Sequence, residues 1–177
     1  FNAPRGVAVS PLDGQVAVSD TYNWRIETFT NAGAFVQQFG SRGRGPYKFN
    51  YARSVAYSPL NGDIIVTDTD NGRIHAYTAA GVFKWSTGIA GKGGIGQFRN
   101  PQALAVASDG TIYVTDSNNM RIQVLSATGA LLRMFGSTAE FGYPRGIAID
   151  PVNGSLWVAD SAKDKITNWS TTGTLVK

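Results

Sequence analysis

The chain has 177 residues, of which 42% are hydrophobic and 16% charged, and its formal net charge at pH 7 is +4. This balance predicts one soluble globular domain and excludes a disordered or fibrous chain, and the apolar runs are too short to span a membrane. The absence of cysteine excludes disulfides, thiolate nucleophiles and cysteine-ligated zinc, and it leaves the compartment undetermined.

The first 45 residues predict four short strands rather than helices. The segment 6–10 is rich in small and β-branched residues and ends at the turn Pro11-Leu12-Asp13-Gly14. A second strand ends at Asp20, a third begins at Arg25, and the segment 35–39 forms a fourth. The turn residues between these segments separate them as they do in antiparallel hairpins.

The same pattern recurs along the whole chain. The octapeptide at residues 19–26 returns at 67–74 and 115–122, and in weaker form at 159–166, so its aspartate repeats after 48, 48 and 44 residues. Four strands at such a period are typical of a propeller blade, whose apolar faces are covered by neighbouring blades. We therefore predict an all-β protein, a single segment 1–177 with four-stranded antiparallel blades at about 1–45, 46–92, 93–137 and 138–177.

The repeated motif resembles that of the NHL-repeat family. It reads D-x-x-N-x-R-I after a strand, with P-x-G-[VI]-A at the start of a blade, and lysines at Lys163 and Lys165 weaken it in the fourth copy. The resemblance implies a β-propeller, usually of six blades, that binds protein or RNA, with some relatives that are lyases. Four repeats are fewer than such a ring needs.

Three arrangements remain open for these blades. They can form an arc of a larger ring, a closed ring of four blades, or a ring completed by other copies. Because the chain begins at Phe1 and not at methionine, we expect it to be part of a longer protein. An open arc would expose two apolar blade faces and self-associate.

The charged residues repeated at each hairpin are expected to be structural. An aspartate at the end of the second strand and a basic residue at the start of the third can pair and bind the turn backbone. These residues are Asp20, Arg25, Asp68, Arg73, Asp116, Arg121, Asp160 and Lys165.

The sequence predicts no catalytic residue, no metal ligand set and no cofactor. His75 is the only histidine, and its place on the third strand predicts a surface imidazole. The glycine motif at residues 91–96 matches G-x-G-x-x-G but leads into a strand, whereas a dinucleotide site needs a helix there. The segment 68–72 is similar to a calcium loop but lacks its later glutamate, so we interpret it as a hairpin.

Charge is predicted to separate between the two ends of the blades. The hairpins between second and third strands and the linkers between blades carry most of the basic residues, whereas the opposite turns carry Asp13, Asp63, Asp109 and Asp150 and no basic residue. Such a basic face attracts anionic partners. Its candidate binding residues are Arg5, Arg53, Gln102 and Arg145 around the channel mouth, with Tyr22, Trp24, Arg42, Arg44 and Arg99 in the adjoining loops.

These observations favour a non-enzymatic scaffold that binds a protein or peptide, acidic partners included, through the basic face. Single-stranded RNA on the same face is the alternative, since aromatic side chains lie near the arginines. A fragment of an NHL-type lyase that lacks its catalytic blades is a weaker third hypothesis.

Overall fold

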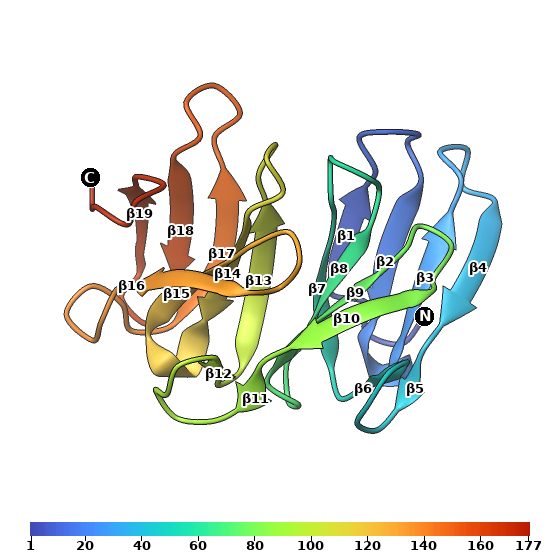
Figure 1. Ribbon diagram of the computed structural model, residues 1–177, viewed down its shortest axis with the longest axis horizontal. Helices are drawn as coiled ribbons and strands as arrows, with labels where there is room; N and C mark the ends of the chain where they lie inside the picture. Colours follow the sequence, from blue (N-terminus) through green and yellow to red (C-terminus); the bar gives the residue numbers. More distant parts are fainter.

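The computed structural model describes residues 1–177 and is built almost entirely of β-strands (Figure 1). Three four-stranded sheets and one three-stranded sheet follow one another along the chain, each with its strands in sequential antiparallel order. These are the predicted blades. The two helical segments are single 3-10 turns, and no helix could cross a membrane.

Each blade begins with the strand nearest the centre of the molecule. Blade 1 consists of β1 (Gly6–Val9), β2 (Val16–Asp20), β3 (Arg25–Phe29) and β4 (Phe35–Phe39). Blade 2 consists of β7 (Ala52–Tyr57), β8 (Ile64–Asp68), β9 (Arg73–Tyr77) and β10 (Phe83–Thr87). Blade 3 consists of β13 (Pro101–Val106), β14 (Ile112–Asp116), β15 (Arg121–Leu125) and β16 (Leu131–Phe135). Blade 4 consists of β17 (Pro144–Ile149), β18 (Leu156–Asp160) and β19 (Lys165–Trp169).

The hairpin between the second and third strands has the same backbone in every blade. In blades 1 and 3 it contains the 3-10 turns η1 (Thr21–Asn23) and η2 (Ser117–Asn119). The residue before the third strand then adopts a left-handed conformation, with φ values between 50° and 60° at Trp24, Gly72, Met120 and Asp164. These positions vary in sequence but share one conformation, so the backbone and not the side chain defines the hairpin.

Short linkers join consecutive blades. Two of them contain a parallel pair of two-residue strands, β5 (Ser41–Arg42) with β6 (Lys48–Phe49) and β11 (Ile89–Ala90) with β12 (Gln97–Phe98). Each linker ends in a phenylalanine that the fold buries completely or nearly so, namely Phe49, Phe98 or Phe141. Its ring packs against a glycine of the preceding blade, which anchors each blade to the one before it.

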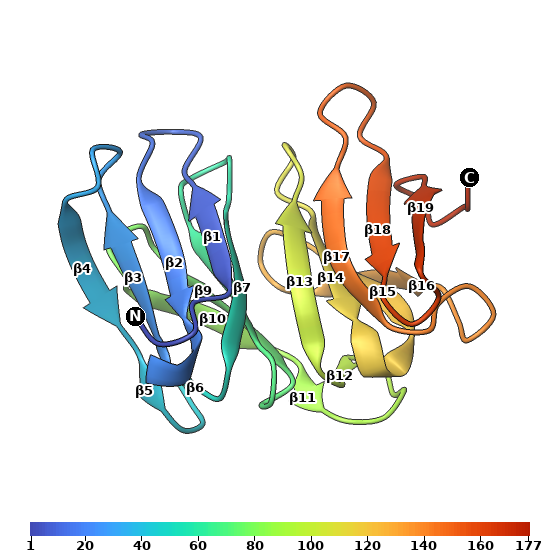
Figure 2. The same ribbon diagram turned by 180° about the vertical axis from the view of Figure 1, so that it is seen from behind.

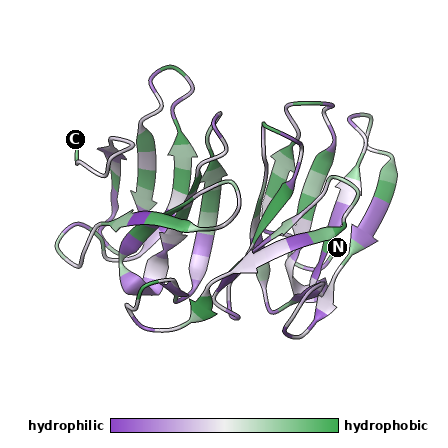
Figure 3. Cartoon of the chain, in the orientation of Figure 1, coloured by the Kyte–Doolittle hydropathy of each residue, from purple (hydrophilic) through white to green (hydrophobic).

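The hydrophobic core consists of three separate seams between adjacent blades. In Figure 3 hydrophobic segments lie along the strands, whereas many of the turns are hydrophilic. Ile26 of blade 1 packs with Val55 and Val66 of blade 2, and corresponding side chains fill the seams from blade 2 to 3 and from blade 3 to 4. Both faces of the inner blades are therefore covered.

The fourth seam is missing, so the four blades form an open arc (Figure 2). The innermost strands pack in the order β1, β7, β13, β17, and no such packing joins β17 to β1. Ile26, Ile74 and Ile122 are fully buried, whereas the equivalent Ile166 of blade 4 is 67% exposed. The chain is therefore not a closed ring of four blades, and an open arc is compatible with both of the other arrangements that the sequence left open.

The other open face belongs to blade 1. Val7 is 68% exposed, whereas the equivalent Val55 and Leu104 are buried. Phe1, which corresponds to the buried linker phenylalanines, is 65% exposed. A methyl group added at Gly33 would meet no atom within 4 Å, whereas one added at its counterpart Gly81 would lie 2.8 Å from Phe39 of the preceding blade. Blade 1 therefore presents a complete but uncovered half of a seam.

We expect substitutions at equivalent isoleucines to differ in effect because only one of the two positions is buried. Ile74→Ala removes a fully buried side chain from a seam and should lower the free energy of unfolding by about 2–5 kcal/mol. Ile166→Ala in dilute solution should change it by no more than about 0.5 kcal/mol. Urea unfolding of both variants measures the difference, and equal losses would show that the blade 4 face is covered.

Candidate functional site

A buried aspartate organises the hairpin end of every blade. Asp20 accepts hydrogen bonds from the Asn2 N–H at 2.6 Å and from Asn23 Nδ2 and Arg25 Nε, both at 2.8 Å. The contact to Asn2 ties the hairpin to the linker that enters the blade. The carboxylate thus joins three parts of the chain that the sequence places apart.

Blade 3 repeats this arrangement with one more donor. Asp116 accepts from the Arg99 N–H at 2.7 Å, from Asn119 at 2.9 Å, and from Arg121 Nε and Gln123 Nε2 at 2.8 Å. The predicted pairing of aspartate with arginine therefore exists in blades 1 and 3.

In blades 2 and 4 the hairpin aspartate accepts its hydrogen bonds without the basic residue of the motif. Asp68 accepts from the Asn50 N–H and from Asn71, each at 2.7 Å, but forms no ion pair with Arg73. Asp160 accepts four backbone N–H groups, from residues 142, 143, 162 and 163, and Lys165 forms no ion pair. For these two blades the expected pair is wrong, because amide donors already occupy the carboxylate.

His75 is buried, which corrects the expectation of a surface imidazole. It is fully enclosed, and its Nε2 lies 3.2 Å from Asp68 Oδ2, while the ring of Phe49 packs against its edge. The equivalent residues Glu27, Gln123 and Thr167 are also buried. Because side chains alternate along strand β9, His75 lies on the face of the sheet opposite to Ile74. The linker covers that face as well, so His75 is buried.

Three of the four residues that we predict around the mouth of the central channel lie near one another at the hairpin end. Arg5, Arg53 and Arg145 are close enough to influence one another: burial lowers the pKa of Arg53, and the positive charges of Arg5 and Arg145 lower it further. Gln102, in contrast, is buried, with Nε2 donating to Asn100 Oδ1 and Oε1 left without a partner. Three of the four residues are therefore available to a ligand at this mouth.

A small hollow of about 180 Å³ lies between these groups. Arg5 and Arg53 line it with Tyr51, Asp70 and Asn100. Burial raises the pKa of Asp70, and the nearby Asp68 raises it further while Arg53 opposes the shift. Arg5, Arg53 and Arg145 form no ion pair, and Asp70 is the nearby carboxylate that partly offsets the positive charge at Arg53.

The aromatic candidates beside the mouth already contact other side chains. The guanidinium of Arg5 lies over the ring of Tyr22 at 5.7 Å, and the edge of that ring meets Tyr51 at 5.3 Å. Arg42 covers the ring of Trp24 at 5.2 Å. These rings orient the arginines, and one face of each ring is occupied.

The remaining basic candidates border other hollows than the one at the mouth. Arg42 and Arg44 border one shallow hollow with Asn50 and Asn71, and Arg99 borders another. The structure therefore divides the predicted basic face into a central group and two linker groups.

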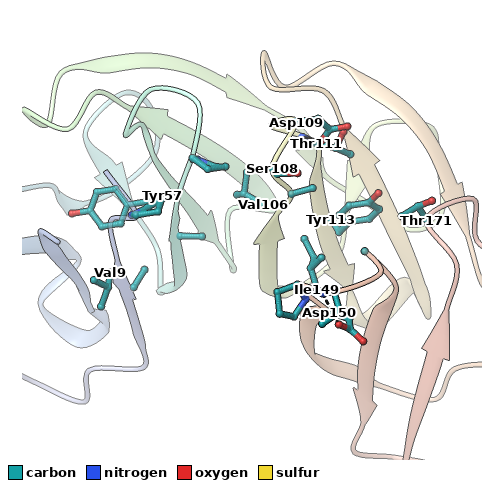
Figure 4. A pocket seen from close by; sticks show the side chains of 18 of the residues that line it. Val9, Tyr57, Val106, Ser108, Asp109, Thr111, Tyr113, Ile149, Asp150 and Thr171 are labelled. Atoms are coloured by element: carbon teal, nitrogen blue, oxygen red, sulfur yellow. Dashed lines mark hydrogen bonds between the residues drawn. The ribbon is translucent and has the colours of Figure 1, made fainter. Parts of the chain in front are cut away.

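The largest hollow lies at the opposite end of the inner strands, where no sequence motif pointed to a site (Figure 4). It measures about 1030 Å³ and takes residues from all four blades, including Val9, Tyr57, Val106 and Ile149. Burial raises the pKa of Tyr57, whose hydroxyl lies 2.9 Å from Gln15 Oε1. The lining combines residues of the inner strands with residues of the turns at this end, and only the curvature of the arc brings the four blades' contributions together.

The acidic turns at this end have basic neighbours, contrary to the predicted charge separation. Lys84 Nζ lies 2.5 Å from Asp63 Oδ2, and Arg133 borders the large hollow together with Asp109. Both cations come from fourth strands, whose long side chains reach past the end of the sheet. The prediction counted the turns alone and is wrong on this point.

The glycine motif 91–96 forms the linker loop between β11 and β12. Its carbonyl groups at Gly93 and Gly94 accept hydrogen bonds from Arg121, at 3.1 and 3.0 Å. A phosphate loop needs backbone N–H groups directed at the ligand. The carbonyls and their arginine make this segment a structural connection.

Comparison with known proteins agrees with this architecture. The family model described as "NHL repeat" matches residues 49–77 and 98–125, which lie in blades 2 and 3. Blades 2 and 3 therefore match the NHL repeat, and the chain as a whole has the β-propeller fold. No curated protein matches the sequence.

Several solved structures share the fold of this chain at low sequence identity. A streptogramin B lyase has a TM-score of 0.76 at 19% identity, with 99% of this chain and 54% of that one covered. A catalytically inactive variant of virginiamycin B lyase from Staphylococcus aureus, solved with quinupristin, has 0.76 at 18%, covering 98% and 54%. Hydrazine synthase from Kuenenia stuttgartiensis has 0.79 at 15%, covering 100% and 49%. The chain spans about half the length of these proteins.

The hairpin aspartates should make stability fall in acid. Burial alone would raise the pKa of Asp20 and of Asp160, but hydrogen bonds outweigh it and hold both below the usual value. A lowered folded-state pKa gives stability that is present above about pH 4 and lost as the pH falls through that folded-state value. Urea unfolding of Asp160→Asn should show a lower stability at pH 7 and a smaller loss on acidification than the wild type.

Asp164→Asn is the matched control, since Asp164 is an exposed residue of the same hairpin. It should keep the wild-type profile. An acid profile that is the same for Asp160→Asn and the wild type would contradict the assignment.

Proposed function

We propose that this chain is a non-enzymatic binding scaffold that captures an acidic peptide segment of a partner protein at the channel mouth. The observation that carries the proposal is the convergence of Arg5, Arg53 and Arg145 without an ion pair. Like charges held together raise one another's energy, and carboxylates of a ligand would relieve this repulsion.

The state of the other arginines supports this choice of residues. Arg25 is paired with Asp20 and Glu27, and Arg121 with Asp116 and linker carbonyls. Those two groups are committed to the fold. The three arginines at the mouth have no such partner and are held on the starts of the innermost strands, where the blades fix their spacing.

Peptide is favoured over single-stranded RNA by the aromatic side chains. Sequence-tolerant binding of a single strand relies on open ring faces on which bases stack. Beside this mouth Arg5 covers one face of Tyr22, and in the adjoining hairpin and linker Arg42 covers one face of Trp24. The guanidinium groups are therefore better placed to bind carboxylates than the aromatic rings are to stack with bases.

The weaker hypothesis of a lyase fragment finds little support in the residues. The similar lyases share the fold with this chain at less than 20% identity. The only histidine here is enclosed and bound to Asp68, so it reaches no hollow of the surface. A scaffold that binds a peptide requires no histidine at a surface hollow.

The proposal predicts a specific loss of peptide binding. A fluorescently labelled peptide of glutamate and alanine should bind at low salt and be released as salt rises. The triple variant Arg5→Gln, Arg53→Gln, Arg145→Gln should raise its Kd by roughly tenfold or more, because desolvated charge contacts at the mouth are lost. Fluorescence anisotropy measures both effects.

A charge-matched control separates the mouth from the general basic surface. The triple variant Arg44→Gln, Lys48→Gln, Lys92→Gln removes the same charge from exposed linkers and should change the Kd by less than about threefold. Equal losses in both variants would contradict a site at the mouth. Tighter binding of labelled oligouridylate than of the peptide, lost in the mouth variant, would instead establish RNA as the ligand.

A further inference from the structure

The two uncovered blade faces are the two halves of one seam. Within the chain this seam occurs three times, always between the rear face of one blade and the front face of the next. Blade 4 presents its rear face with Ile166 exposed, and blade 1 presents its front face with Phe1 and Val7 exposed. We propose that a second copy of this chain covers both, blade 4 of each copy packing on blade 1 of the other.

The apolar parts of the two faces correspond to those of the internal seams. Ile26, Ile74 and Ile122 lie fully buried in the seams that follow their blades, and Ile166 is the fourth member of this series. Its partners in an internal seam include Val55 and Val66, for which Val7 and Val18 stand in blade 1. Docking would therefore bury side chains of the same kind that already pack together inside the chain.

A polar contact is complementary as well. At each internal seam a hydroxyl after the hairpin aspartate donates to the carbonyl of the first residue of the next innermost strand. Thr21 Oγ1 donates to Ala52 O at 2.7 Å, Thr69 Oγ1 to Pro101 O at 2.8 Å, and Ser117 Oγ to Pro144 O at 2.5 Å. Ser161 is the equivalent hydroxyl in blade 4, and Pro4 O is the equivalent carbonyl in blade 1. The second copy brings this fourth pair together.

The same contact would bury Phe1 in the position that the other linker phenylalanines occupy. Phe49, Phe98 and Phe141 each pack under the preceding blade, whereas Phe1 has only Phe29 of its own blade beside it, at 5.8 Å. Blade 4 of a second copy supplies the preceding blade. Because blade 4 has three strands, the space beside Gly33 stays free at this seam.

The size of the missing part points to a partner as large as the chain itself. Larger proteins follow the arc along 98–100% of its length with TM-scores of 0.76–0.79, while the arc covers 49–54% of them. The arc therefore corresponds to about half of the residues of such a chain. A second copy of four blades supplies the other half.

Two copies related by a twofold axis would form two identical seams and leave no blade face uncovered. Once one seam has formed, the second closes within the same complex, which favours the closed pair over an open filament. Closure would also turn the large hollow between the inner strands into an enclosed channel and place the arginines of both copies around one mouth. This proposal is independent of the peptide site.

Sedimentation velocity tests the closed pair. The wild type should sediment at twice the monomer mass of 18.9 kDa. Val7→Lys and Ile166→Glu each place a charge in both seams of a pair, so each variant alone should dissociate to monomers at concentrations where the wild type is paired. An equimolar mixture should recover pairs, because one of its seams is native and the other brings lysine and glutamate together.

Two substitutions elsewhere on the surface provide matched controls. Val152 is 91% exposed in a turn and Ile95 is 83% exposed in a linker, so Val152→Lys and Ile95→Glu should leave the pair intact. Circular dichroism should give the same spectrum for all variants, since Val7 and Ile166 are both about two-thirds exposed in the single chain.

The possible outcomes decide the proposal. A wild type that stays monomeric at high concentration would overturn it, as would polymers without a limiting size. Single variants that remain paired would place the contact elsewhere. Failure of the mixture to recover pairs would exclude the exchange of blades 4 and 1.

Discussion

Each blade of this protein is a small sheet with apolar side chains on both faces, and neither face can be left in water without cost. Two inner blades satisfy this constraint by packing between neighbours, which divides the core into three seams instead of one centre. The arrangement of the innermost strands, the channel and the two uncovered faces all follow from it. Stability therefore depends on how many faces are covered.

The buried hairpin aspartate fixes the position of the linker relative to the hairpin in each blade. Asp116 receives four hydrogen bonds from the linker, the hairpin and the third strand, and Asp160 achieves the same with backbone groups alone. A buried carboxylate needs such donors to remain ionised. Once they are in place, the residue that starts each innermost strand has a fixed position, which is how three arginines meet at one mouth.

Much of the fold could be predicted because the sequence contains four copies of the same repeat. The spacing of the aspartates and the alternation of the strands were sufficient to predict the blades and the hairpins between them. The fate of individual side chains was harder to predict. His75 occupies a polar position of a strand, and only the linker bearing Phe49 determines that it is enclosed.

The location of the proposed binding site was predictable in part for the same reason. Arg5, Arg53 and Arg145 share one place in the repeat, so their common location followed from the alignment of blades. The burial of Gln102 did not, because it depends on a contact with Asn100. The large hollow at the other end has no sequence signature, since its walls combine strand and turn residues of all four blades that the curvature of the arc brings together.

The linker phenylalanine has a consequence for how such a chain can change in length. Each of Phe49, Phe98 and Phe141 packs under the blade before its own, and every seam uses the same positions of the repeat. Duplication or deletion of a gene segment that encodes one repeat would therefore create no new type of contact. Repeat number can vary in evolution while the packing chemistry stays constant, and the side chain at each channel-mouth position can diverge separately.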